Sequence, residues 1–258
     1  SKFCKNIMFN KRIIPQLLIS HGKLVKTEKF KSSIYVGDPI NTAKIFNEKE
    51  VDELSIIDIG CTRYNYEPNY TLIEQIANEC FMPISYGGGI TNFKQASRIL
   101  RSGVEKIIIQ SSFFKNPNLI SEIAESFGAQ SIIINLDIVL VKGEYKLFKK
   151  GFFRNYRQDK LESMLEMVNK LGFGELQIMA VDREGTLNGL DMDIIKIARR
   201  FIDKPIILCG GANSLDNIKL GFNNGAFAIG VGRMFCLHGP FKAVLIDYPK
   251  RELISKIL

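Results

Sequence analysis

The sequence predicts one domain over residues 1–258 that folds as a (β/α)₈ barrel, or TIM barrel, in which helices surround a closed parallel β-barrel. Short apolar runs alternate with longer amphipathic segments from end to end, as in chains that build parallel sheets. The apolar runs are continuous, which is typical of strands buried on both faces. The chain also contains an internal repeat. Its 258 residues are close to the roughly 250 that such a barrel uses as one domain.

Eight apolar runs are expected to form the barrel strands. They span Ile13–Leu18, Leu54–Asp58, Pro83–Tyr86, Lys106–Ile109, Ser131–Leu136, Leu176–Val181, Ile206–Cys209 and Ala226–Gly230. Apolar residues recur at helical spacing in most of the segments between them. The expected helices include Tyr70–Cys80, Lys94–Arg101, Leu119–Phe127, Leu161–Leu171, Ile194–Phe201 and Leu215–Phe222. A β-hairpin is expected after the fifth strand, at Val139–Phe148 around Lys142-Gly143-Glu144.

The internal repeat favours a closed barrel over an open, doubly wound sheet. Glu53-Leu54 recurs 122 positions later as Glu175-Leu176, and Gly88-Gly89 recurs at the same offset as Gly210-Gly211. Gly103 recurs in the same way as Gly225. Two copies of a four-strand unit account for eight strands, and closing them on each other removes both sheet edges.

Charge and cysteine content restrict the possible functions. The net charge is +8, but the basic residues are scattered and form no stripe interleaved with aromatic residues, so a small anionic ligand is favoured over nucleic acid. The five cysteines include no CxxC pair, which argues against a disulfide framework or a zinc site. No apolar run reaches the roughly 18 residues of a membrane span. We expect a cytoplasmic protein without membrane contact, metal or organic cofactor.

Glycines follow two strands at repeat-equivalent positions and predict phosphate binding. The active site of a (β/α)₈ barrel lies at the carboxyl ends of its strands. Glycine there lets backbone N–H groups approach a phosphate, although such residues also simply make turns. Two facing pockets would suit a ligand with a phosphate at each end. The residues expected to form them are Gly88, Gly89, Gln110 and Ser111 in the first half, and Gly210, Gly211, Gly232 and Arg233 in the second.

Three aspartates also end strands. Asp137 precedes the expected hairpin, where no helix needs a cap, so it is interpreted as a catalytic acid or base. Asp58 and Asp182 fit a catalytic role and a helix-capping role equally well.

Four charged residues open strands and would face the opposite, amino-terminal mouth of the barrel. They are Arg12, Glu53, Lys106 and Glu175. Lone surface ion pairs add little stability. A closed ring of four would instead plug or gate a channel through the core, and spacing alone does not decide between the two interpretations.

Seven motifs together resemble the cyclase subunit of imidazole glycerol phosphate synthase. They are Arg12-Ile13-Ile14-Pro15, Val36-Gly37-Asp38-Pro39, Asp52-Glu53-Leu54, Gly87–Ile90, Asn116-Pro117, Asp182-Arg183-Glu184-Gly185-Thr186 and Gly210-Gly211-Ala212, in the family's order over nearly the whole chain. The related isomerase barrel of histidine synthesis shares the repeat. The first and sixth of these motifs favour the cyclase.

The resemblance implies a lyase that works as a heterodimer with a glutaminase. The glutaminase would dock at the amino-terminal mouth, and its ammonia would cross the barrel to a bis-phosphorylated ribonucleotide. Arg12, Glu53, Lys106 and Glu175 match the family's charged gate, and Asp182 and Thr186 fall within a motif of the substrate face. The products would be imidazole glycerol phosphate and an aminoimidazole carboxamide ribonucleotide.

One catalytic position departs from the family's pattern. Aspartates at the ends of the first and fifth strands act there as acid and base, and Asp137 matches the second of them, but Leu18 stands at the first. Leucine cannot transfer a proton, and losing one partner of such a pair costs about 10²–10⁴-fold in rate. Gln110-Ser111 also replaces an Asn-Thr pair.

Three hypotheses follow for the function. The first is a cyclase of histidine biosynthesis. The second is a divergent copy of the kind associated with surface-polysaccharide (lipopolysaccharide) loci, which would supply ammonia to a separate amidotransferase that converts an acetamido sugar to an acetamidino sugar. Leu18 favours the second, since ammonia delivery needs no complete acid/base pair. The third is a non-enzymatic binding or scaffold barrel.

Overall fold

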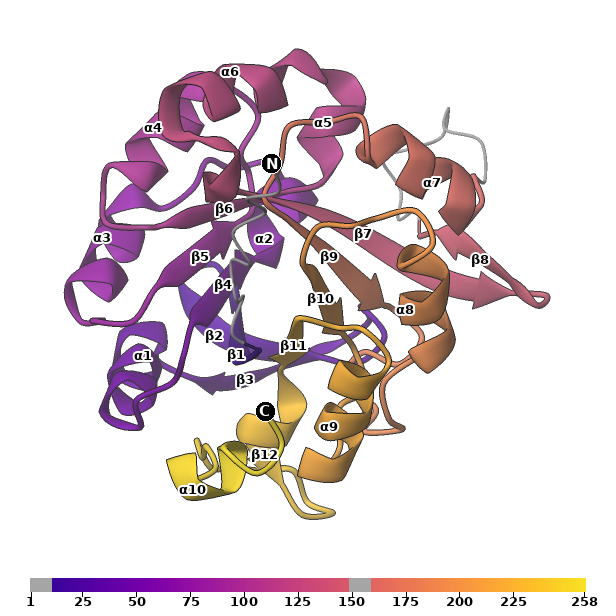
Figure 1. Cartoon of the computed structure of the whole chain (residues 1–258). Helices are drawn as coiled ribbons and strands as arrows, with labels where there is room; N and C mark the ends of the chain where they lie inside the picture. The colour runs from indigo at the N-terminus through magenta and orange to yellow at the C-terminus, as the bar shows by residue number, and fades with distance from the viewer. Residues whose placement is uncertain (1–10, 149–158) are drawn as a thin grey trace, which may run out of the picture.

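A computed structural model describes residues 11–148 and 159–258 and confirms the predicted (β/α)₈ barrel. Eight parallel strands form the barrel, and the pairing of β11 with β1 closes it. Figure 1 looks along the barrel, with helices around the ring of strands. The barrel strands are β1 (Arg12–Ser20), β4 (Leu54–Asp58), β5 (Ile84–Gly87), β6 (Lys106–Ile109), β7 (Ile132–Val141), β9 (Glu175–Ala180), β10 (Ile206–Cys209) and β11 (Ala228–Val231).

Helices follow the strands and cover the outside of the barrel (Figure 1). Many begin at a side-chain cap, such as Asn92 before α4 and Ser214 before α9. Each predicted helix forms, with ends that shift by a few residues. The helices are α1 (Pro39–Glu48), α2 (Ile59–Tyr64), α3 (Tyr70–Asn78), α4 (Phe93–Leu100), α5 (Ser111–Lys115), α6 (Asn118–Phe127), α7 (Leu161–Val168), α8 (Met192–Ala198), α9 (Leu215–Asn223), α10 (Arg251–Ile254) and the 3₁₀ turns η1 (Ala129–Ser131) and η2 (Arg233–Phe235).

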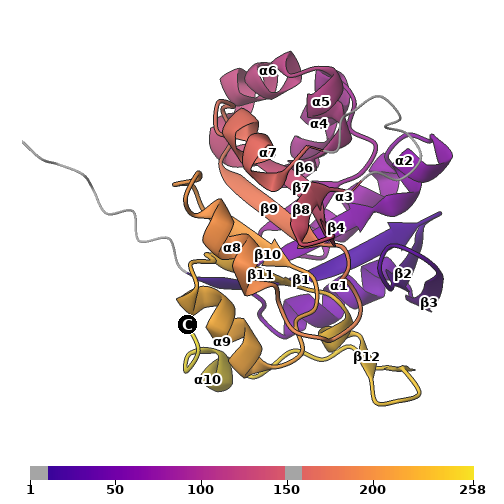
Figure 2. The same ribbon diagram turned by 90° about the vertical axis from the view of Figure 1, so that its right-hand side faces the viewer.

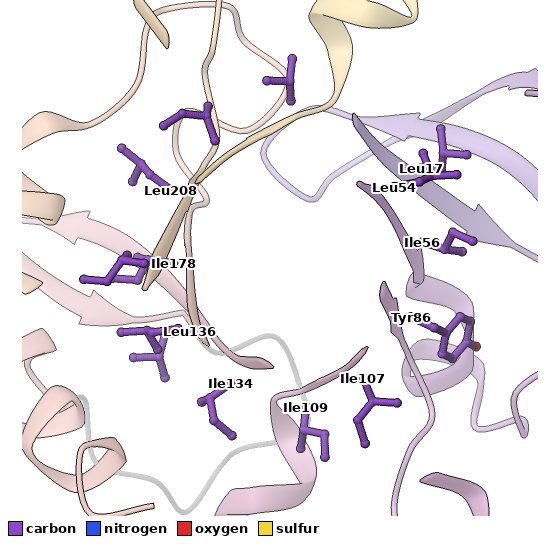
Figure 3. Close-up of a cluster of buried hydrophobic side chains, with 14 of the residues drawn as sticks. Leu17, Leu54, Ile56, Tyr86, Ile107, Ile109, Ile134, Leu136, Ile178 and Leu208 are labelled. Carbon is purple, nitrogen blue, oxygen red and sulfur yellow. The ribbon is translucent and has the colours of Figure 1, made fainter. Parts of the chain in front are cut away.

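The main hydrophobic core lies between the strands and the helices. Alternate strand residues such as Leu54, Ile134 and Ile178 are fully buried there and belong to one cluster with helix residues. Figure 3 shows side chains of this cluster on the outer side of the ring of strands. Because successive strand residues point to opposite faces, the residues between them face the barrel interior.

The barrel interior holds a second, smaller apolar cluster. Its members come from strands on opposite sides of the ring: Ile14, Ile108, Ile133, Met179, Val181, Ile207, Cys209 and Ala228. The interior also contains buried polar side chains, among them Gln16 on β1 and Gln177 on β9. A barrel interior of this size is a packed core, so these polar groups must find partners within it.

An antiparallel extension follows the first strand of each half. β7 continues into β8 (Glu144–Leu147) through the turn at Lys142-Gly143, which confirms the predicted hairpin. Its counterpart was not predicted: β1 turns back into β2 (Lys23–Thr27) and β3 (Ser33–Gly37). In the side view of Figure 2, β2 and β3 lie at the end of the barrel to which β1 runs.

Several short elements were not predicted. They are α1, α2, α5, the small pair β12 (Leu237–His238) and β13 (Ala243–Val244), and α10. The four cysteines within the described residues, Cys61, Cys80, Cys209 and Cys236, are free, and Cys4 lies outside those residues. In the part of the chain that the structure describes, no helix is long and apolar enough to cross a bilayer.

Candidate active site

Four charged side chains meet in a closed ring at the amino-terminal mouth of the barrel. Arg12 contacts Glu53 at 3.1 Å and Glu175 at 2.6 Å. Lys106 closes the ring, with its Nζ 2.9 Å from Glu53 and 2.8 Å from Glu175. Each cation thus touches both carboxylates. The residues come from the starts of β1, β6 and β9 and from the position before β4, so the parallel barrel itself brings them together.

The two carboxylates of the ring differ in their environment. Burial alone would raise the pKa of Glu175, but Lys106 and Arg12 outweigh it and hold that pKa below its ordinary value. Burial dominates at Glu53 and raises its pKa despite the same two cations. Arg12 and Lys106 both contact Oε2 of Glu53, whereas its buried Oε1 has no hydrogen-bond partner among the described residues. Glu175 is therefore the more firmly ionised of the two.

Two pockets open at the opposite end of the barrel, where the strands finish. The large pocket, about 390 Å³, is lined by Gly88, Gly89, Gln110, Ser111 and Asp137 among others. The small pocket, about 40 Å³, is lined by Gly210, Gly211, Gly232 and Arg233 among others. Leu18, Thr27, Phe30 and Met179 line both. One elongated ligand could therefore occupy the two pockets together.

The glycines of the two pockets have equivalent backbone conformations. Gly88 and Gly210 have φ of +123° and +100°, which strain any other residue. A Cβ atom would lie 2.3 Å from the carbonyl oxygen of Asp58 at Gly88, and 2.5 Å from that of Ala180 at Gly210. Their neighbours Gly89 and Gly211 also have positive φ. These positions thus require glycine for the turn itself, independently of a ligand.

Asp137 stands in the wall of the large pocket and is held by amide groups. Gln110 donates from Nε2 to Oδ2 at 2.7 Å, and Asn135 donates from Nδ2 to Oδ1 at 2.9 Å. Burial raises the pKa of Asp137, and these two hydrogen bonds only partly offset the rise. A carboxyl with a raised pKa in a pocket is suited to proton transfer near neutral pH.

Leu18 occupies the corresponding place at the end of the first strand. Its side chain is 8% exposed and lines both pockets. It presents only apolar atoms to a ligand. The pocket walls therefore carry a proton-transfer group on β7 and none at this position of β1.

The other aspartates have structural partners or lie outside the pocket walls. Asp58 caps α2 by accepting from the N–H groups of Gly60 and Cys61, and it also accepts from the hydroxyl of Tyr66. It nevertheless lines the large pocket. Asp182 lines neither pocket.

Thr186 also lies outside both pocket walls. Its hydroxyl donates to the carbonyl of Arg183 and accepts from the N–H of Asn188, so it closes a turn. The structure thus does not bring the two candidates Asp182 and Thr186 together with the glycines.

Comparisons with known proteins identify the family. A family model described as "Histidine biosynthesis protein" matches residues 12–241. The "Putative imidazole glycerol phosphate synthase subunit HisF" of Leptospira interrogans is 44% identical over 95% of this chain and 97% of its own. The "Putative imidazole glycerol phosphate synthase subunit hisF2" of Pseudomonas aeruginosa is 42% identical over 94% of this chain and 97% of its own. The "Imidazole glycerol phosphate synthase subunit HisF" of Exiguobacterium sibiricum is 34% identical over 86% and 88%.

The chain belongs to the HisF family. Two features of this HisF-family barrel were not predicted from its sequence. The first is Lys26, a lysine 4% exposed that lines the small pocket together with Arg233 and donates to the carbonyl of Gln16. Arg233 itself donates to the carbonyl of Gly185. The available signal in the sequence was a lysine directly after the apolar pair Leu24-Val25, since a lysine in a buried strand is rarely left without a partner.

The second feature is an aromatic pair between the two extensions. Phe30, after β2, and Phe148, after β8, meet edge to face with ring centroids 5.7 Å apart. Both line the large pocket. The extensions of the two half-barrels of this HisF-family barrel therefore meet at the large pocket. Among the described residues, no cluster of His, Cys, Asp or Glu could hold a metal ion.

Proposed function

We propose that this chain is the ammonia-using cyclase subunit of an imidazole glycerol phosphate synthase. One observation carries the proposal: a closed ring of four charges stands at one end of the barrel interior, and two connected glycine-lined pockets with Asp137 stand at the other. The names of the HisF relatives support the same activity.

The substrate would be a bis-phosphorylated ribonucleotide that spans the two pockets. Backbone N–H groups at Gly88-Gly89 and Gly210-Gly211 would bind one phosphate each, with Arg233 in the second pocket. The helical turns that begin at Ser111 and Arg233 have no side-chain cap among the described residues, so their first N–H groups are available to an anion. Gln110 and Ser111 would complete the first pocket.

Asp137 would transfer the protons of the reaction. Burial raises its pKa towards the neutral range, and the amides of Gln110 and Asn135 fix its orientation. Ammonia would attack the carbonyl of the bound ribonucleotide with loss of one molecule of water, and the adduct would then cyclise and split into imidazole glycerol phosphate and an aminoimidazole carboxamide ribonucleotide. Enclosure in the pocket would exclude water as a competing nucleophile.

A partner glutaminase would supply the ammonia as the second subunit of a heterodimer. It would dock over the ring of Arg12, Glu53, Lys106 and Glu175, and the ring would open to admit ammonia to the interior. Each cation bonds two carboxylates, so one side chain can turn aside while the others stay paired.

Leu18 favours a second candidate function, in which the barrel conducts ammonia without cyclising a ribonucleotide. A separate amidotransferase would then consume the ammonia, for example to convert an acetamido sugar to an acetamidino sugar of a surface polysaccharide. This function needs the ring and the interior path, and it does not need an acid at the end of β1.

Turnover with the bis-phosphorylated ribonucleotide and ammonium chloride separates the two functions. If the chain is a cyclase, both products should form at a rate typical of cyclases. That result would exclude a barrel that only conducts ammonia. If no product forms, Leu18→Asp is the decisive variant. A gain of roughly 10²-fold or more would mean that only the acid was missing. A variant that folds and still forms no product would refute the cyclase proposal.

A further inference from the structure

Hydrogen-bonded carboxamides cross the interior of the barrel. Gln16 on β1 donates from Nε2 to Oε1 of Gln177 on β9 at 3.2 Å and to Sγ of Cys209 on β10 at 3.3 Å. In the strand order, β11 and β10 lie between β1 and β9. The Gln16 side chain therefore reaches across the interior and does not follow the sheet.

The chain of amides continues to the catalytic carboxylate. Gln177 donates from Nε2 to Oδ1 of Asn135 at 3.0 Å. Asn135 in turn donates to Oε1 of Gln110 and to Oδ1 of Asp137, each at 2.9 Å. We call Gln16, Gln177 and Asn135 the amide bridge. Its members are 4%, 2% and 7% exposed, so these hydrogen bonds are largely shielded from water.

The amide bridge separates the charged ring from the pockets. Gln177 follows Glu175 of the ring by two positions on β9, so it lies one step further along the interior. Gln16 lines the small pocket, and Asn135 and Gln177 line the large one. The bridge residues thus line both pockets, and Gln177 lies between them and the ring along β9.

An unpaired hydroxyl lies beside the bridge. Ser55 on β4 is 1% exposed, and its Oγ has no hydrogen-bond partner among the described residues. Ser55 is in register with Gln16 on the neighbouring strand β1. Its register neighbour on the other side is Ser85 on β5, which is also 1% exposed. Ile14 and Ile133, two positions before Gln16 and Asn135, belong to the apolar cluster of the interior. A buried polar atom without a partner is costly and points to a ligand that satisfies it.

We propose that the amide bridge and the Ser55 hydroxyl form a binding site for one molecule of neutral ammonia between the ring and the pockets. Ammonia both donates and accepts hydrogen bonds, and the bridge and the hydroxyl offer both kinds of group. Ammonium, in contrast, would lose its hydration there without gaining a carboxylate. The direction of travel, from the ring to Asp137, rests on the proposed function.

Binding can be tested without any reaction. The side-chain amide resonances of Gln16, Gln177 and Asn135 are assigned by their loss in Gln16→Met, Gln177→Met and Asn135→Leu. Ammonium chloride at alkaline pH, where part of the ammonium is neutral, should shift these resonances saturably, and potassium chloride at equal ionic strength should not. Gln95 on α4 lies outside the interior and serves as an internal control. Equal shifts of these resonances in ammonium chloride and potassium chloride would refute the proposed ammonia-binding site.

Passage is tested by the ratio of glutamine-dependent to ammonium-dependent turnover in the complex with a glutaminase. Gln16→Met keeps the volume and removes the amide, so the ratio should fall about three- to ten-fold, as for the loss of one or two hydrogen bonds. The ratio cancels any effect on the pockets themselves. Gln95→Met, another buried glutamine, is the matched control and should leave the ratio unchanged.

A double variant sharpens the test. Because Gln16 and Gln177 form one bridge, Gln16→Met with Gln177→Met should lower the ratio little more than either change alone. An unchanged ratio in folded single variants would refute a role in passage. If the wild-type complex makes no product from glutamine, the proposed function fails, and the amide resonances still decide whether ammonia binds.

Discussion

The two half-barrels share a backbone design and differ in their ionisable side chains. Gly88 and Gly210 have similar positive φ values, and each lies against the carbonyl oxygen that ends the preceding strand. The first strands of the two halves, in contrast, carry Leu18 and Asp137 at equivalent positions beside the pockets. The pockets thus share a backbone geometry, whereas only the second half has a carboxylate at this strand position.

The opposite mouth shows the reverse asymmetry. Arg12, Glu53 and Lys106 of the ring come from the first half, and only Glu175 comes from the second. The counterpart of Lys106 in the repeat is Ala228, at the start of β11. The difference teaches that the halves supply different groups: the first provides both cations of the ring, and the second provides Asp137 to the large pocket, which Asp58 of the first half also lines.

Replacing the pocket carboxylate should have the largest effect on this division. Asp137→Asn keeps the shape and removes the proton-transfer group, so product formation should fall by about 10²–10⁴-fold. Steady-state assays with ammonium chloride measure the loss. Asp182→Asn, outside both pockets, is the matched control and should lose less than about ten-fold. Near-wild-type turnover in Asp137→Asn would mean that the second half does not hold the acid/base group.

Removing one cation of the ring should impair ammonia entry at the amino-terminal mouth and leave the reaction in the pockets unaffected. Lys106→Met leaves Glu53 and Glu175 with Arg12 only, so glutamine hydrolysis should be uncoupled from ammonia use. The free energy of unfolding should also fall by about 3–5 kcal/mol, because carboxylates are left partly unpaired. The measurements are the yield of product per glutamine hydrolysed and urea denaturation. Full coupling in a folded variant would contradict the gate.

Glycine substitutions test whether the two halves share their backbone constraint. Gly88→Ala and Gly211→Ala should each destabilise the fold by about 1–3 kcal/mol, because in both the new Cβ would lie 2.3 Å from a backbone carbonyl oxygen. Such variants are therefore poor probes of ligand affinity. At Gly22 a Cβ meets nothing within 4 Å, so Gly22→Ala should cost less. If urea denaturation shows that Gly22→Ala lowers the free energy of unfolding more than the other two substitutions, this constraint is contradicted.

The smallest expected effect is a change in how stability depends on pH. The pKa of Glu175 is lowered in the folded state, so its ionised form stabilises the fold above the ordinary value of 4.5. That contribution is lost as the pH falls through the folded value. Glu175→Gln lacks it, so its free energy of unfolding should decline less steeply with acid than that of the wild type. Parallel curves from urea denaturation between neutral and acid pH would contradict the assignment.

Sequence patterns predicted the barrel because its determinants are local. Continuous apolar runs and the repeat of glycines were sufficient for the eight strands, and Lys142-Gly143 revealed the hairpin after the fifth. The same signal at His21-Gly22 was missed, although both pairs have positive φ at both residues, as a two-residue hairpin turn requires. A shared turn chemistry could therefore have indicated the first extension.

The site was less predictable because it depends on contacts between distant strands. The strand starts and ends placed the charged ring and the pocket glycines correctly in space, but their roles in gating and phosphate binding stay predictions. Thr186 was chosen from a motif, and its hydroxyl closes a turn. The amide bridge could not be foreseen, since Gln16 and Gln177 meet only because the barrel closes.

The pairing of β11 with β1 also bears on how the chain reaches its native state. Arg12 and Ala228, near the two ends of the chain, are partners in this last seam. During synthesis the edges of β1 and of each newest strand stay open until β11 emerges, and open edges invite wrong pairing. Contacts between such distant segments also form slowly. Completion of the cylinder should therefore be the late, rate-limiting event of folding.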